Sequence, residues 1–327
     1  MSQFYVISAV ATFILVLCNI HELKAQLELV HYGNTCAMAE QIVKDEVRNA
    51  FNRDPGLAAG LVRLQFHDCF IRGCDGSVLI DSTSSNTAEK DSPNAPGLQG
   101  FEVIDKAKAR IEAVCRGVVS CADIVAFAVR DSIEMTGGLG YDVQAGRRDG
   151  RVSLASEASS GLTSPGDNLT KLTQAFAKRG LTQEDMVTLS GAHTIGRSHC
   201  TSFTYRLYNY NNTGVQDPSL DRAYAAHLQQ ECPQKIPTLA KLVVPMNPSS
   251  PAVTDAGYYM DVWKNRGMFN SDQTLTSSPR TANQVEQYAM NPMLWKSKFA
   301  AAMVKMGRIG VLTGSDGEIR ANCRVIN

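Results

Sequence analysis

The sequence has no excess of charge of either sign, because 32 Lys and Arg residues balance 32 Asp and Glu residues. It also has no basic run and no regular series of aromatic residues. Nucleic acids and anionic membranes attract proteins largely through positive charge, so we expect neither as a partner. The 327 residues contain no internal repeat and are enough for one large domain or two small ones.

Long apolar runs are absent beyond the first twenty residues, and we therefore expect no membrane-spanning helix. The run SAVATFILVLC is too short and too near the start for an ordinary span, and it is typical of a signal peptide. No Lys or Arg precedes it, but LKA before Gln26 supplies a small residue of the kind found at cleavage sites. We expect residues 1–25 to be a signal peptide and the rest of the chain to be exported.

The sequence has nine cysteines, of which Cys18 would leave with the signal peptide. The others form an even set, which in an exported chain indicates disulfide bonds. Counting alone leaves their pairing open. Sequons at Asn168 and Asn211 are compatible with glycosylation.

The stretch LVRLQFHDCFIRGCDGS, residues 61–77, collects several chemically active side chains. Arg63 and His67 are four residues apart, so on a helix they project from one face and can act on one small molecule. Glycines then bracket a tight segment in which Asp68, Asp75 and Ser77 offer hard oxygen ligands, as calcium prefers. Taken singly, an Arg and His pair is more often a solvated surface, and two nearby aspartates are more often a turn.

The whole pattern R-x-x-F-H-D-C-F-x-x-G-C-D-x-S resembles the distal haem motif of the secretory (class III) plant haem peroxidases. The resemblance implies that Arg63 and His67 are a catalytic pair above a haem iron. It also implies a distal calcium ion, held by Asp68, Asp75 and Ser77 with the carbonyls of Ile71 and Gly73, and supported by Glu89.

The segment EKDSPN, residues 89–94, resembles the family segment that carries a distal asparagine, and we assign that role to Asn94. The family usually places this asparagine one residue further from the glutamate. An Asn94 oxygen that accepts the proton of one His67 ring nitrogen would leave the other nitrogen free to act as a base. The alternative is a turn asparagine.

A second chemical stretch, DMVTLSGAHTIGRSHC at residues 185–200, resembles the proximal motif of the same family. The resemblance makes His193 the axial ligand of the iron and Asp272, in GMFNSDQTL, the carboxylate that holds it. A lone histidine after small residues would otherwise be read as a packed core residue. The segment NPSSPAVTD resembles the proximal calcium loop, whose ligands would be Thr194, Asn247, Ser250, the Val253 carbonyl and Asp255. Asn247 stands where the family has an aspartate, so we expect this calcium to bind more weakly.

The segment YDVQAGRRDG contains two adjacent arginines. In the family, one such arginine pairs with an aspartate of the preceding helix, which implies a pair between Arg147 and Asp123 in this chain. The family generally has a proline where this chain has Gln144. The backbone carbonyl at this position usually helps to bind aromatic donors. Gln144 is therefore the candidate donor-binding residue.

The resemblance covers Gln26 to Asn327 and implies an all-α haem peroxidase fold of about ten helices, with four disulfides and two calcium sites. A distal sub-domain, residues 26–165, and a proximal one, residues 166–327, would enclose one haem b. The implied disulfides are Cys36 with Cys115, Cys69 with Cys74, Cys121 with Cys323, and Cys200 with Cys232. Periodicity predicts helices over Ala37–Asn52, Phe101–Val114, Ser120–Thr136, Pro165–Gly180, Thr182–Ala192 and Trp295–Met306, and a loop from Asp81 to Gly100.

The resemblance implies a secreted monomer, in the extracellular space or cell wall with the vacuole as the alternative. It would reduce hydrogen peroxide and oxidise phenolic donors one electron at a time. One rival hypothesis is a peroxidase-fold haem protein with a structural or wall-binding role. Another is a zinc protein that uses histidines and cysteines around His67 and His193. Their spacing matches no common zinc motif, and paired cysteines could not bind a metal.

Overall fold

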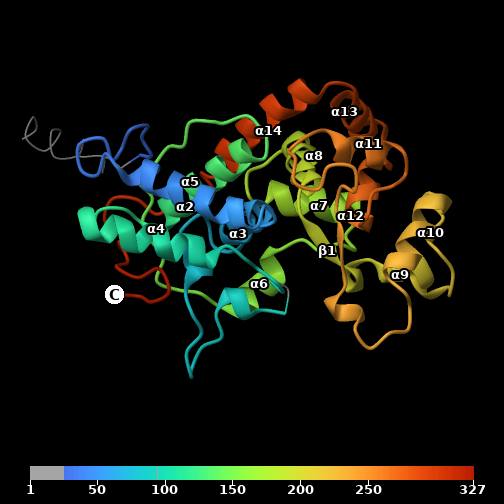
Figure 1. Cartoon of the computed structure of the whole chain (residues 1–327), viewed down its shortest axis with the longest axis horizontal. Coiled ribbons are helices and arrows are strands. Elements are labelled where there is room, and N and C mark those ends of the chain that lie inside the picture. The colour runs from blue at the N-terminus through green and yellow to red at the C-terminus, as the bar shows by residue number, and fades with distance from the viewer. Residues whose placement is uncertain (1–25, 94) are drawn as a thin grey trace, which may run out of the picture.

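The computed structural model describes residues 26–93 and 95–327, and over these residues the fold is almost entirely helical (Figure 1). The predicted signal peptide and Asn94 lie outside the described residues. The helices are α2 (Ala39–Arg53), α3 (Leu57–Ile71), α4 (Phe101–Val114), α5 (Cys121–Met135), α6 (Ala155–Gly161), α7 (Leu169–Ala177), α8 (Gln183–Ser190), α9 (Thr204–Tyr208), α10 (Arg222–Glu231), α11 (Gly257–Trp263), α12 (Asn270–Gln273), α13 (Pro279–Met290) and α14 (Pro292–Met306). The expected all-α class is confirmed, and the extra helices include short ones such as α12, whose 4 residues are too few to show periodicity.

Capping residues explain where the sequence located helix ends well and where it did not. The Ser120 side chain accepts from the Asp123 N–H at 3.1 Å and begins α5, and Thr182 forms a capping box that begins α8. The helix predicted from Pro165 begins only at Leu169, because the Asn168 side chain accepts from the Lys171 N–H at 3.0 Å. That prediction was wrong by four residues at its start.

Helix α5 is the buried centre of the first half, where it packs against α2, α3 and α4 (Figure 1). Arg147 Nη1 pairs with Asp123 Oδ1 at 2.8 Å beside it, as predicted. In the second half, α8 packs against α13 and α14, and α11 packs against α13. One hydrophobic core extends from Leu64 of α3 to Trp295 of α14. The division into two sub-domains stays a prediction.

A two-stranded antiparallel sheet steadies the chain just beyond His193. Strand β1 (Arg197–His199) pairs with β2 (Val243–Pro245), with Arg197 opposite Pro245. A smaller hydrophobic cluster around the Cys200–Cys232 bond lies next to it. The sheet therefore joins the segment that carries His193 to the segment that leads into the predicted proximal calcium loop.

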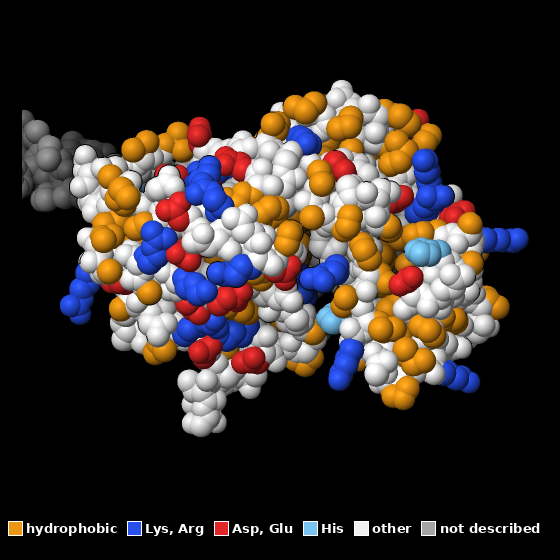
Figure 2. All heavy atoms as spheres, in the orientation of Figure 1, with side chains coloured by type: hydrophobic (Ala, Val, Ile, Leu, Met, Phe, Trp, Pro, Cys, Tyr) orange, Lys and Arg blue, Asp and Glu red, His pale blue; other side chains and the backbone are white. Residues whose placement is uncertain are grey.

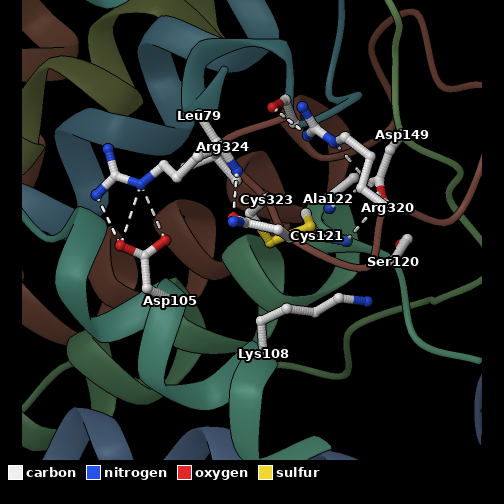
Figure 3. The surroundings of a disulfide bond; sticks show 12 residues. Leu79, Asp105, Lys108, Ser120, Cys121, Ala122, Asp149, Arg320, Cys323 and Arg324 are labelled. Atoms are coloured by element: carbon white, nitrogen blue, oxygen red, sulfur yellow. Dashed lines mark hydrogen bonds and ion pairs between the residues drawn. A yellow bond between two sulfur atoms is a disulfide. The ribbon is translucent and has the colours of Figure 1, made fainter. Parts of the chain in front are cut away.

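Four disulfides are present, as expected: Cys36–Cys115, Cys69–Cys74, Cys121–Cys323 and Cys200–Cys232. The Cys121–Cys323 bond ties the C-terminal segment to the start of α5 (Figure 3). Arg324 in the same segment pairs with Asp105 of α4 at 2.7 Å (Figures 1 and 3). Around it, the Asp149 carboxylate accepts from the backbone N–H groups of Cys121, Ala122 and Arg320 at 2.9 to 3.1 Å.

The face shown in Figure 2 carries Lys and Arg side chains interspersed with Asp and Glu over the α2 to α4 half, so its charge is of mixed sign. Among the described residues, no helix combines the length and the apolar character needed to cross a membrane.

Candidate active site

Helix α3 carries Arg63 and His67 one turn apart, as their spacing predicted. Arg63 is exposed and its Nη1 donates to the Pro96 carbonyl at 2.9 Å, whereas His67 is only 4% exposed. Burial and the positive charge of Arg63 lower the pKa of His67 to about 3, so the imidazole is neutral at ordinary pH. His67 Nδ1 has no hydrogen-bond partner among the described residues, and the partner predicted for it, Asn94, lies outside them.

His193 lies in a 3₁₀ helix, Gly191–Thr194, that directly follows α8. Its Nδ1 is 2.8 Å from Oδ1 of Asp272, which comes from α12 and is 2% exposed. The backbone just before His193 packs closely against α11 and α14, because a Cβ on Gly191 would lie 2.6 Å from both Trp295 Nε1 and the Tyr259 hydroxyl. A ring that donates Nδ1–H to a carboxylate keeps its lone pair on Nε2, and the side chain is 41% exposed. His193 can therefore bind a metal through Nε2.

Tyr258 is a member of this group that the sequence did not reveal. Its hydroxyl donates to the same Asp272 Oδ1 at 3.1 Å, and its ring lies edge-on to His193 at 5.9 Å between centroids. Phe269 closes another side of the imidazole at 5.4 Å. The two adjacent tyrosines at 258 and 259 carried no recognisable signal, because only the fold brings α11 against Asp272.

The oxygens predicted to hold the distal calcium come together at the end of α3. Asp68, Asp75, Ser77 and Glu89 are all buried, and Asp68 accepts from the Gly76 N–H at 2.9 Å. Both Glu89 oxygens and the Ser77 hydroxyl make no hydrogen bond of ordinary geometry. Burial raises the pKa values of Asp68 and Asp75, and burial together with the Asp68 charge raises the pKa of Glu89 to about 9. A cluster of buried carboxylates in which Glu89 accepts no hydrogen bond of ordinary geometry is a chemical fit for a divalent cation.

The two predicted carbonyl ligands lie in the same loop. The Ile71 carbonyl accepts from Arg179 Nη2 at 3.0 Å, and the Gly73 carbonyl accepts from the Asp75 N–H at 2.8 Å. Gly73 has φ of 138°, and a Cβ there would lie 2.4 Å from the Gly310 carbonyl oxygen, so only glycine fits. In the described parts of the chain, no three His, Cys, Asp or Glu side chains form a metal-ligand group by themselves. A cation here would therefore depend on hydroxyl and carbonyl oxygens as well.

The five residues of the predicted proximal calcium site also lie together. Thr194 Oγ1 donates to Asp255 Oδ1 at 3.0 Å and to the Val253 carbonyl at 3.4 Å, and Ser250 Oγ donates to Asp255 Oδ2 at 2.6 Å. Asn247 Nδ2 donates to Ser250 Oγ at 2.9 Å and to Asp255 Oδ1 at 3.2 Å, while its buried Oδ1 has no partner. This set fits a cation less well than the distal set, because Asp255 is its only carboxylate.

Gln144 has no visible part in this arrangement. Its carbonyl accepts from Arg147 Nη1 at 2.6 Å, and its side-chain oxygen accepts from Arg308 Nε at 2.8 Å. The small pocket beside it is lined by Gln65, Tyr141, Arg147, Met303 and Arg308 among others. Neither His67 nor His193 lines that pocket. The donor-binding role of Gln144 stays a prediction without structural support.

Comparison with known proteins identifies the family. The family described as Peroxidase matches residues 43–291. "Peroxidase 5" of Vitis vinifera is 68% identical over 97% of this chain and 96% of its own length. This chain belongs to the class III plant peroxidases. "Peroxidase 3" of Arabidopsis thaliana is 49% identical over 93% of each chain, and "Peroxidase 1" of Zea mays is 48% identical over 93% of this chain and 84% of its own.

Membership of this family decides between the rival hypotheses. A class III peroxidase is a haem peroxidase, an oxidoreductase that depends on hydrogen peroxide, and the purely structural role is not favoured. The zinc hypothesis fails on the structure as well, because Cys69, Cys74 and Cys200 are all in disulfides.

Proposed function

We propose that this peroxidase is a secreted, monomeric haem b enzyme of the extracellular space or cell wall, with the vacuole as the alternative location. Phenolic or other aromatic molecules would be its donors. The observation that carries the proposal is the pairing of a buried, neutral His67 with Arg63 on one helix face, in a chain that also holds His193 against the buried Asp272. Its two sub-domains, residues 26–165 and 166–327, would enclose the haem.

His67 and Arg63 would divide the work on hydrogen peroxide. The neutral imidazole of His67 accepts a proton from one peroxide oxygen and returns it to the other, which leaves as water. The guanidinium of Arg63 stabilises the negative charge that develops on the departing oxygen. Asn94 would hold the His67 ring in the tautomer that leaves Nε2 free. Overall, two electrons and two protons convert one peroxide into two waters.

On the other side, His193 Nε2 would bind the haem iron, and Asp272 would make that imidazole a stronger electron donor. The haem, when bound, supplies the electrons that break the O–O bond, and each of two phenolic donors then gives up one electron. A stronger donor ligand favours the more oxidised iron. The hydrogen bond from His193 Nδ1–H to Asp272 therefore supports chemistry that begins from ferric iron.

Calcium would occupy both oxygen clusters. The distal ion would be held by Asp68, Ile71, Gly73, Asp75 and Ser77, with Glu89 in support. The proximal ion would be held by Thr194, Asn247, Ser250, Val253 and Asp255. The unpartnered Ser77 and Glu89 oxygens support the distal assignment, and the unpartnered Asn247 Oδ1 supports the proximal one.

The absorption spectrum of the purified protein tests this function directly. We expect a Soret band that shifts when hydrogen peroxide is added and returns when a phenol such as guaiacol is added, with steady phenol turnover. A protein without a Soret band would contradict the proposal. A Soret band without phenol turnover would favour the structural or binding role instead.

Chelation should remove the proximal calcium first, because the proximal site has one carboxylate and the distal cluster has several.

Removal of the distal ion should then make the free energy of unfolding depend on pH. Glu89, with its pKa raised to about 9, stays protonated in the folded chain where the unfolded chain has lost that proton. The unfolded state then binds fewer protons, so the free energy of unfolding falls as pH rises between about 4.5 and about 9.

Urea unfolding at several pH values, with calcium and with chelator, measures this slope. Calcium should abolish the slope, and Glu89→Gln should reduce it in the chelated protein because that side chain cannot titrate. Metal analysis that finds two equally retained ions would contradict the order of release. A chelated protein whose stability does not change with pH would contradict the distal assignment.

A further inference from the structure

The Tyr258 hydroxyl and the His193 imidazole share one carboxylate oxygen. Tyr258 donates to Asp272 Oδ1 at 3.1 Å, and His193 Nδ1 lies 2.8 Å from the same atom. Asp272 Oδ2 accepts from the Phe269 N–H at 2.8 Å. The carboxylate therefore serves three donors, and two of them compete for Oδ1.

The carboxylate of Asp272 and the side chain of Tyr258 are shielded from water, which makes the competition matter. Asp272 is 2% exposed and Tyr258 is 3% exposed. Hydrogen bonds to an ionised group are stronger in a medium of low dielectric constant than in water, and no solvent is at hand to replace a lost donor. Each hydrogen bond that Asp272 accepts spreads the negative charge of the carboxylate further. Less of that charge then remains to pull the proton of His193 Nδ1.

We propose that Tyr258 is a positioning residue that weakens the hydrogen bond between His193 and Asp272, and so raises the reduction potential of the iron that His193 binds. The inference rests on the proposed role of His193 as iron ligand. With the phenol present, the imidazole has less imidazolate character and donates less electron density to the metal. Tyr258 has no contact with a reacting molecule in this scheme, because it acts only through Asp272.

The test is Tyr258→Phe in the haem-bound protein, with the ferric/ferrous potential measured by spectroelectrochemical titration. The change deletes one hydroxyl and keeps the ring beside His193. Asp272 Oδ1 then acts on His193 alone, ferric iron is favoured, and the potential should fall. We expect the ferric-to-ferrous ratio at a fixed potential to rise about fivefold to tenfold, equal to about 40 to 60 mV for one electron.

Tyr259→Phe is a matched control on the same helix. Tyr259 is fully buried, and its hydroxyl donates to the carbonyls of Val187 and Thr188 at 2.8 and 2.9 Å rather than to Asp272. Tyr259→Phe deletes one hydroxyl, as Tyr258→Phe does, and comparable hydrogen bonding is lost. The free energy of unfolding should therefore fall, while the reduction potential should stay at the wild-type value. Equal shifts in the two variants would overturn the proposal.

Asp272→Asn separates this inference from the function beneath it. The neutral amide is a weaker acceptor for His193 Nδ1–H, so the potential should rise. If Asp272→Asn raises the potential and Tyr258→Phe leaves it unchanged, the role of Tyr258 is wrong and the proximal assignment stands. If neither variant moves the potential, the assignment of His193 and Asp272 falls, and the inference falls with it.

Discussion

Replacement of His67 by leucine should slow the reaction with hydrogen peroxide by about 10²-fold to 10⁴-fold, the range that a positioned general base contributes. The reason is local. His67 is buried and neutral, and it lies one helical turn from the only cation that we assign to the peroxide. Leucine fills the same space without a lone pair, so haem binding should be retained. Stopped-flow measurement of the Soret change after mixing with peroxide gives the rate.

The same rate should depend on pH in a defined direction. Burial and Arg63 hold the pKa of His67 at about 3, well below its ordinary value of 6.5. The base therefore stays unprotonated as pH falls through the range in which a free histidine would gain a proton. We expect the wild-type rate to stay constant down to about pH 4 and to fall toward pH 3. Loss of rate near the ordinary value would show that the site is more polar than its burial indicates.

His227→Leu is the control for this substitution, because it makes the same side-chain change on an exposed face of α10. It should leave the rate and its pH profile unchanged. If His67→Leu reacts as fast as His227→Leu, His67 is not the base, and the catalytic assignment of α3 fails.

Local spacing was enough to place Arg63 and His67 on one helix face, because residues four apart are neighbours on a helix whatever surrounds them. Their catalytic role came from the family resemblance and stays a prediction. The proximal half is different. His193 and Asp272 are 79 residues apart, so no periodicity relates them, and only the family resemblance placed them together. Tyr258 was missed for the same reason, since its partner is fixed by the packing of α11 against α12 rather than by its neighbours in sequence.

Side-chain competition explains the remaining differences. The Asn168 side chain caps the N-terminus of α7, so this helix is shorter than the one expected from Pro165. Helix periodicity does not show this effect. The Gln144 carbonyl accepts from Arg147, a contact that the sequence did not show, and its donor-binding role stays a prediction. In the proximal cluster, the Asn247 amide donates to oxygens that would otherwise face a cation. Each outcome depends on which of several donors the folded chain places within hydrogen-bonding distance of an acceptor.

The loss of the Cys121–Cys323 bond should lower the free energy of unfolding by about 5 kcal/mol on a chain-entropy model, because it closes a loop with a sequence separation of 202. The Cys69–Cys74 bond has a separation of 5 and should contribute only about 2 kcal/mol. Urea unfolding of the two double alanine variants measures this order. A larger loss from the short ring would contradict the entropic account.

Peroxide kinetics should reverse that order of effects. Arg320 Nη2 donates to the Gly76 carbonyl at 2.6 Å. The Arg320 backbone N–H donates to Asp149 at 2.9 Å (Figure 3), and neither contact involves the Cys121–Cys323 bond, so we expect both to remain in the Cys121→Ala/Cys323→Ala variant. These contacts keep the C-terminal segment against the loop that follows α3, so the folded variant should react with peroxide at the wild-type rate. The Cys69–Cys74 ring begins two residues after His67 and fixes the end of α3. Loss of the Cys69–Cys74 bond should therefore change the peroxide rate more than loss of the Cys121–Cys323 bond does, although it should lower the free energy of unfolding less. The reason is that the base and the distal oxygen ligands share that one short segment.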